Sequence, residues 1–274
     1  PPDVSPAPGS RVTPAQRFNA VIAAARSTAI ANYVMDIPTD SPQEEKRGWC
    51  GDSLATHRTY ASFFDMRAAW IKWTEDVAAT ASVWKPAGAV PAKAPCIMTP
   101  GVCVDDPRGE SQMAHVLTGT AWGSLLPQLS AFTAALTEDD RYASRMAGAA
   151  SVYVGQLQSY ANDASYAFPE LLNVSSGVDN VNVGKQGWPA SAYGDWCPTH
   201  PKGYGDHPMG QGACTSVSAL LNSVYFILDM DAAAALLRAA GKAAAGGDHP
   251  SEAQFVRWAA MARKSFMEAF LHRI

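Results

Sequence analysis

Helical spacing of apolar residues, repeated along most of the chain, is the feature that most limits what this sequence can fold into. Apolar side chains recur at three-, four- and seven-residue steps, which places them on one face of an α-helix. No pair of segments shows a convincing strand pattern. The spacing predicts an all-α fold with about six substantial helices, near residues 14–35, 53–82, 112–136, 139–163, 214–243 and 251–272.

The ends of the first helix are marked locally. Residues 1–12 are rich in Pro and are interpreted as an extended arm or linker that precedes a helical domain covering 13–274. Thr13-Pro14 predicts a helix start, because a hydroxyl caps the first turn and Pro suits the first helical position. The helix is expected to run to about Met35 and to stop before Ile37-Pro38.

The connections between the predicted helices alternate between short and long. The long ones are residues 36–52, 84–110 and 165–213. Helical hairpins joined in this way pack as bundles, solenoids or a closed ring of helix pairs, and the lack of a fixed repeat disfavours a solenoid. In a ring of antiparallel pairs, alternate connections lie at the same end. We therefore expect the three long loops to share one mouth, where a pocket could be built on a rigid scaffold.

Several helices show apolar stripes that predict their buried faces. In the helix near 214–243, one stripe contains Val217, Leu220, Leu221, Val224 and Leu228. In the helix near 251–272, a second stripe contains Phe255, Trp258, Ala262, Phe266 and Phe270. Because Trp70, Trp73 and Trp258 occur at helical spacing with other apolar residues, we expect them in the core and not at a ligand site.

Bulk properties exclude several functional classes. A net charge of −4 gives no electrostatic footprint for nucleic acid or an anionic membrane, and no apolar run approaches the roughly 20 residues of a membrane helix. The chain has no phosphate-binding Gly loop before a helix and no Gly-x-Ser-x-Gly elbow. It also has no calcium-loop pattern and no closely spaced zinc-type cysteines. We therefore expect no cofactor and no metal.

Five cysteines leave the redox state open. Cys96 and Cys103 bracket one loop, and Cys197 and Cys214 bracket another. Either pair could form a disulfide in an oxidising compartment, which would favour a secreted or extracytoplasmic location and leave Cys50 over. The alternative is five free thiols in a reducing compartment.

The densest polar cluster runs from Asp40 to Asp52 and reads Asp-Ser-Pro-Gln-Glu-Glu-Lys-Arg-Gly-Trp-Cys-Gly-Asp. Cleavage of a glycosidic bond needs a protonated carboxylic acid for the leaving oxygen and a carboxylate on the opposite face. Clustered acids raise one another's pKa, and Trp49 could form an apolar wall for a sugar. By composition alone, a solvated turn of mixed charge is the competing interpretation.

The order of residues favours the first interpretation, because it resembles the signature of glycoside hydrolase family 78, the α-L-rhamnosidases. That signature reads approximately Asp-Cys-Pro-Gln-Arg-Glu-(Lys/Arg)-x-Gly-Trp-x-Gly-Asp. The positions that match in register are Asp40, Pro42, Gln43, Glu45, Gly48, Trp49, Gly51 and Asp52. Ser41 and Glu44 depart from it. Further along, Trp122-Gly123 resembles a Trp-Gly-Asp-Ala element with Ser124 where Asp is usual, and Gly194-Asp195-Trp196 resembles a Gly-Asp-Trp element.

The resemblance implies an (α/α)6 barrel, of which this chain would supply about half, the N-terminal portion. It implies that Glu45 is the general acid and that Asp40 and Asp52 bind rhamnose hydroxyls. It also implies that aromatic and acidic side chains shape the sugar subsite, namely Trp49, Trp122, Asp195 and Trp196.

Members of this family invert the anomeric centre, and their general base is a Glu far downstream. No element of this chain matches the base. The expected partners are therefore a rhamnose-containing glycan or glycoside and the C-terminal half of the barrel, in the same gene product or in a separate chain. The alternative is a catalytically incomplete, rhamnosidase-like subunit that binds sugar or acts as a scaffold. A trehalase-like or unsaturated-uronyl hydrolase is a third possibility, which the order of the motif disfavours.

Overall fold

The computed structural model of the chain describes residues 12–34, 36–43, 46–82, 90, 93–94, 98–99, 102–103, 120–161, 218–241 and 249–271. These residues are mostly helical, which confirms the all-α class. The helices are α1 (Pro14–Ala31), α2 (Cys50–Phe63), α3 (Arg67–Ser82), α4 (Thr120–Gly123), α5 (Leu125–Thr137), α6 (Asp140–Ala161), α8 (Ser218–Ala240), α9 (Glu252–Phe266) and the π-helical turn η5 (Met267–Leu271).

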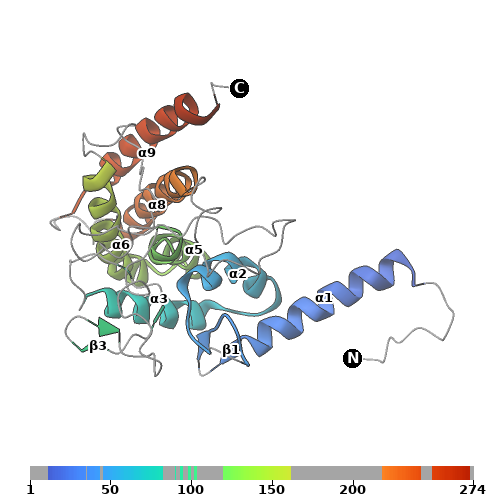
Figure 1. Cartoon of the computed structure of the whole chain (residues 1–274). Helices are drawn as coiled ribbons and strands as arrows, with labels where there is room; N and C mark the ends of the chain where they lie inside the picture. The colour runs from blue at the N-terminus through green and yellow to red at the C-terminus, as the bar shows by residue number, and fades with distance from the viewer. Residues whose placement is uncertain are drawn as a thin grey trace.

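Helices α5 and α8 lie at the centre of the packed body (Figure 1). Helix α8 contacts α4, α5, α6 and α9, and α5 also contacts α2, α3 and α6. Trp70 and Trp73 are fully buried, as the sequence predicts, and Trp258 is half-buried against Phe255. The largest fully buried side chains are Trp70, Trp73, Tyr142, Tyr153, Phe226, Phe255, Leu125, Leu126, Leu129 and Leu157.

Helix α1 begins where the sequence predicts but ends earlier. The Thr13 hydroxyl accepts from the Gln16 N–H at 3.2 Å, and the Gln16 side chain accepts from the Thr13 N–H at 2.8 Å, so the two form a capping box. The helix stops at Ala31 and not near Met35. Thr39 explains this end, because its N–H and its hydroxyl both donate to the Asn32 carbonyl, at 2.6 and 3.0 Å.

Two short hairpins contradict the prediction that the chain has no strand pair. Strands β1 (Tyr33–Val34) and β2 (Ile37–Pro38) pair antiparallel, as do β3 (Met98–Thr99) and β4 (Val102–Cys103). Strands of two residues are too short for alternation to be visible in a sequence. Asp36, with a φ of 63°, takes the left-handed conformation in the first turn, which Asp tolerates better than most residues.

The helix expected near 53–82 is two helices. It starts at Cys50, ends at Phe63, and restarts at Arg67. Phe64 is extended, with a φ of −138°. The Asp65 carboxylate accepts from the Arg67 N–H at 3.2 Å, so it caps the new first turn. Both helices pack on the same core, so apolar spacing continues from α2 into α3. The break between them therefore cannot be recognised from periodicity alone.

The stripe predicted for α8 is wrong where the structure tests it. Val224 and Leu228 are 36% and 44% exposed, while Phe226, Met230 and Leu236 are buried. Apolar residues surround α8 on nearly every side, so periodicity could not identify its inner face. The stripe of α9 is confirmed at Phe255 and Ala262, which are buried, and at Trp258 and Phe266, which are half-buried. The side chains of Val217, Leu220, Leu221 and Phe270 lie outside the described residues.

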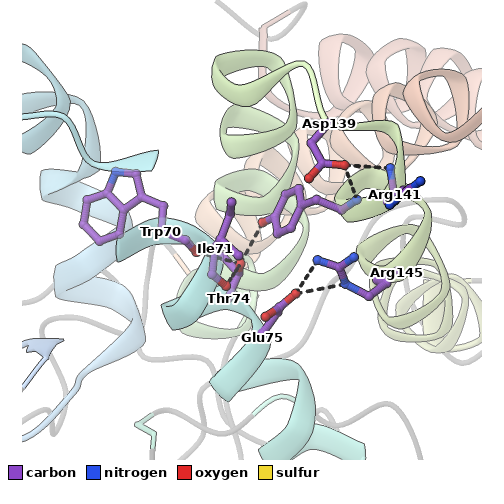
Figure 2. Close-up of polar contacts among 8 residues, drawn as sticks. Trp70, Ile71, Thr74, Glu75, Asp139, Arg141 and Arg145 are labelled. Atoms are coloured by element: carbon purple, nitrogen blue, oxygen red, sulfur yellow. Dashed lines mark hydrogen bonds and ion pairs between the residues drawn. The ribbon is translucent and has the colours of Figure 1, made fainter. Parts of the chain in front are cut away.

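Polar contacts fasten α3 to α6 (Figure 2). Arg145 donates to Glu75 through Nε at 2.9 Å and through Nη2 at 2.7 Å. Deeper in the interface, the Thr74 hydroxyl lies 2.7 Å from the Tyr142 hydroxyl. Asp139 caps α6 by accepting from the Arg141 and Tyr142 N–H groups. The buried hydroxyl pair is worth more than the exposed ion pair, because solvent screens the latter.

Helix α1 projects from the rest of the helices (Figure 1) and, in the described part of the chain, makes its main contacts with α2 and β1. Its apolar residues Phe18, Val21 and Ile30 are 65%, 64% and 59% exposed. Among the described helices, none combines the length and apolar character required to cross a bilayer.

Candidate active site

The polar motif forms a loop whose two ends meet just before α2. The Asp40 N–H donates to the Arg47 carbonyl at 3.3 Å, and the Lys46 N–H donates to the Ser41 carbonyl at 2.9 Å. Lys46 has a φ of 54° and turns the chain back. Glu44 and Glu45 lie outside the described residues, so the candidate acid has no described side-chain position. The backbone pairs on both sides define where the loop leaves and returns.

The second long loop reaches the motif loop. The Ala94 N–H donates to the Gly48 carbonyl at 2.9 Å, and Lys93 pairs with Trp49 as an isolated β-bridge. A Cβ at Gly48 would overlap Trp73 and the Ala94 carbonyl, so only glycine permits this approach. Two of the three loops expected at one mouth therefore touch. The third, 165–213, lies outside the described residues.

Trp49 is half-buried and one of its faces is already occupied. The Lys93 ammonium lies 5.4 Å from the ring centroid of Trp49, within the range of a cation–π contact. Lys93 is only 6% exposed. A sugar could therefore meet Trp49 only on its other face or at its edge. The sequence did not identify Lys93, which lies in a Pro-rich loop and resembles an ordinary surface cation.

The two motif aspartates differ in environment. Asp40 is half-buried, and its Oδ1 is buried with no hydrogen-bond partner among the described residues. A buried acceptor of this kind usually finds a partner, such as a ligand hydroxyl. Asp52 is exposed in the first turn of α2, where the helix dipole favours an acid. Asp40 is thus an acceptor held at the loop base, and Asp52 is a solvent-facing acid in the first turn of α2.

Trp122 and Gly123 are the last residues of α4, and Ser124 joins α4 to α5. We call this junction the 122–124 turn, and each of its three residues contacts a different helix. Trp122 is half-buried and lies against the motif, since a Cβ at Gly51 would come within 2.7 Å of its indole. Gly123 lies against the ring of Tyr153 on α6, where an added Cβ would be 2.8 Å from Cε2. This turn, residues 122–124, brings the predicted Trp122 to the start of α2.

The third residue of the turn binds a buried acid on α8. The Ser124 hydroxyl donates to Asp229 Oδ2 at 2.6 Å, and Gln128 Nε2 donates to Asp229 Oδ1 at 2.8 Å. Ser124, Tyr153 and Asp229 are all fully buried. Burial raises the pKa of Asp229 from its ordinary value of 3.8 to about 8, and this outweighs the two hydrogen bonds, which lower it. Asp229 is therefore protonated at neutral pH.

Tyr153 and Cys50 complete this buried cluster. Burial raises the pKa of Tyr153 well above its ordinary value, Asp229 adds to the increase, and a hydrogen bond with Ser124 opposes it. Burial also raises the pKa of the Cys50 thiol, which lies close enough to Tyr153 to affect the phenol. The cluster therefore remains uncharged near neutral pH, and it includes Cys50, the first residue of α2.

Some predicted site residues cannot be placed. Asp195 and Trp196, like Glu45, lie outside the described residues. Among the described residues, no three His, Cys, Asp or Glu side chains gather as they would around a metal ion. His57 contacts the Leu54 carbonyl and the Phe132 ring, and burial lowers its pKa.

The sequence analysis missed Asp229, although an acid within the apolar run of α8 was a visible signal. Its neighbour Asp231 pairs with Arg263 at the surface and shows the ordinary alternative. Only the fold distinguishes the two acids, because their spacing of two residues places them on different sides of the helix.

Comparison with known proteins agrees with this architecture. Residues 8–273 match a family described as the bacterial alpha-L-rhamnosidase 6 hairpin glycosidase domain. A solved structure titled "Structure of alpha-L-rhamnosidase from Dictyoglumus thermophilum" superposes with a TM-score of 0.63 at 19% identity, over 93% of this chain. The match covers 22% of that protein, so this chain spans about a fifth of its length. No curated protein sequence matches the chain.

Proposed function

The chain belongs to the family of bacterial α-L-rhamnosidase six-hairpin glycosidase domains, and we propose that it supplies the acid half of an active site that removes terminal α-L-rhamnosyl groups. Its helical hairpins are part of an (α/α)6 barrel. The observation that carries the proposal is the motif Asp40–Asp52, which matches the family signature in register and forms a loop contacted by two other segments.

The proposed reaction is a single displacement with inversion. Glu45 gives its proton to the glycosidic oxygen as the bond from C1 to that oxygen breaks. A carboxylate outside this chain takes a proton from water, whose oxygen bonds to C1 from the opposite face. Asp40 Oδ1 accepts a hydrogen bond from a sugar hydroxyl, and Asp52 binds another hydroxyl at the rim. Trp49, Trp122 and Trp196 wall the sugar, and Asp195 orients its loop or contacts the sugar.

The test uses Glu45→Gln and the matched control Glu44→Gln in the full-length protein, with two substrates. General-acid assistance is worth about 10²–10⁴-fold in rate. p-Nitrophenolate leaves readily without a proton, whereas an alkoxide does not. Glu45→Gln should therefore reduce kcat much more for an alkyl α-L-rhamnoside than for the p-nitrophenyl α-L-rhamnoside. Glu44→Gln should retain most activity towards both.

If Glu45→Gln reduced kcat by the same small factor for both substrates, Glu45 would not be the general acid. Proton NMR of the first sugar released should show β-L-rhamnose, because the reaction inverts the anomeric centre, and an α product would exclude inversion. If the full-length wild type binds L-rhamnose without hydrolysing any rhamnoside, the non-catalytic sugar-binding alternative replaces this proposal.

A further inference from the structure

We propose that Asp229, Ser124 and Tyr153 are positioning residues that hold the 122–124 turn, and with it Trp122, against the catalytic motif. This inference rests on the proposed function, in which Trp122 walls the sugar. The three residues come from α8, the start of α5 and α6, so distant segments meet at this one turn. Tyr153 also lies near Cys50 of the motif, and all three residues act on Trp122 through the turn.

The turn has little freedom because its residues are fixed in different directions. Trp122 lies on Gly51, Gly123 lies on the Tyr153 ring, and the Ser124 hydroxyl is 2.6 Å from Asp229. A backbone pressed between two helices and the motif can move only if one of these contacts opens. The hydrogen bond from the Ser124 hydroxyl to Asp229 joins the turn to α8.

The pair also accounts for the departure at position 124. The resembled element has Asp where this chain has Ser, and a carboxyl group nevertheless lies in contact with that position, contributed by Asp229 of α8. One carboxyl and one hydroxyl thus occupy the site. If the role of the acid is to hold the turn, it should not matter which of the two backbone positions carries it.

That reasoning gives a swap experiment. Asp229→Ser leaves two hydroxyls and a Gln128 amide without its acceptor, so it should loosen the turn. The double variant Ser124→Asp/Asp229→Ser keeps one carboxyl, one hydroxyl and the same total volume. Ser124→Ala removes a single buried hydroxyl, and its matched control is Tyr142→Phe, which removes a single buried hydroxyl from the α3–α6 interface.

Two readouts are taken on the full-length protein. The first is hydrogen–deuterium exchange of the peptide covering residues 120–126, which does not depend on activity. The second is kcat and KM for p-nitrophenyl α-L-rhamnoside, because misplacement of a binding group by about 1 Å can cost up to 10²-fold. We expect Ser124→Ala and Asp229→Ser to speed exchange of this peptide about tenfold and to lower kcat/KM at least tenfold. Tyr142→Phe should change neither, and the swap should recover kcat/KM to within about threefold of the wild type.

The outcomes separate the two proposals. If Ser124→Ala behaves like Tyr142→Phe in both readouts, or if the swap is no better than Asp229→Ser alone, the positioning role is wrong while rhamnosidase activity stands. If the wild type neither binds L-rhamnose nor cleaves a rhamnoside, the proposed function falls, and the exchange of residues 120–126 alone decides whether the trio fixes the turn.

Discussion

Replacing Asp229 by Asn should stabilise the fold, by an amount that grows with pH. Asp229 is fully buried between Ser124 and Gln128, and burial raises its pKa to about 8. The protonated acid presents one acceptor and one O–H, which Asn reproduces with its carbonyl and its N–H. Gln128 can still donate to Oδ1, and the Ser124 hydroxyl can rotate to accept from the new amide.

The magnitude follows from proton linkage. An acid whose pKa is raised in the folded state stabilises the fold fully below its unfolded pKa of 3.8 and loses that contribution as pH rises to about 8. Each pH unit in that window is worth about 1.4 kcal/mol. At pH 7 the wild type has therefore lost about 4 kcal/mol that the Asn variant, which does not titrate, retains. Of the described neighbours, Tyr153 and Cys50 titrate, and burial raises the pKa of both, so they stay neutral here.

The assay is the melting temperature of the wild type and of Asp229→Asn between pH 5 and 9, followed by circular dichroism. A gain of 1 kcal/mol shifts Tm by about 2–4 °C in a domain of this size. The gap between the two curves should be about 3–7 °C at pH 5 and about 8–16 °C at pH 7, and the curves should run parallel above pH 8. Curves that stay parallel from pH 5 to 8, or a variant less stable throughout, would mean that Asp229 is ionised in the fold and would refute the reasoning.

Two further substitutions test the packing around the site. Gly51→Ala would place a Cβ 2.7 Å from the Trp122 indole, so it should lower the free energy of unfolding by about 1–3 kcal/mol and lower kcat/KM. The control Gly148→Ala, which has open space around it, should raise the free energy of unfolding by up to about 1 kcal/mol. Equal Tm values for the two variants would contradict the Gly51–Trp122 contact. Tyr142→Phe should lower the free energy of unfolding by about 1 kcal/mol, seen as a Tm lower by about 2–4 °C, and should leave the kinetic constants unchanged. A loss of activity well below the Tm of this variant would contradict the prediction, because it would link the α3–α6 interface to the active site.

Capping residues and apolar spacing predicted where most helices lie, but not which of their faces pack against other helices. Thr13 and Ser251 are both followed three residues later by Gln, and both start helices through capping boxes. These contacts need only neighbouring residues. The break at Asp65 and the inner face of α8 depend on what packs against the helix, so apolar spacing gave one helix where there are two and selected exposed Val224 and Leu228.

The same division applies to the candidate site. The motif Asp40–Asp52 could be recognised because it is contiguous, and its loop lies at the start of α2. The placement of Trp122 against Gly51 could not be derived from spacing, because it depends on how α4 packs on α2. Lys93 and Asp229 were missed for the same reason. Each is an unremarkable charged residue in sequence and becomes distinctive only through burial.

Ser124 shows how a departure from a family pattern changes meaning once the fold is known. Judged by position, a serine in place of aspartate removes an acid and weakens the resemblance. Judged in space, the acid is present 2.6 Å away on a residue 105 positions further along the chain. A buried carboxyl is tolerated there because it is protonated and both of its oxygens are bonded, which avoids the several kcal/mol that an unpaired buried charge would cost. Our proposal is that the turn needs this contact and not a particular residue at position 124, which the exchange of Ser124 and Asp229 tests.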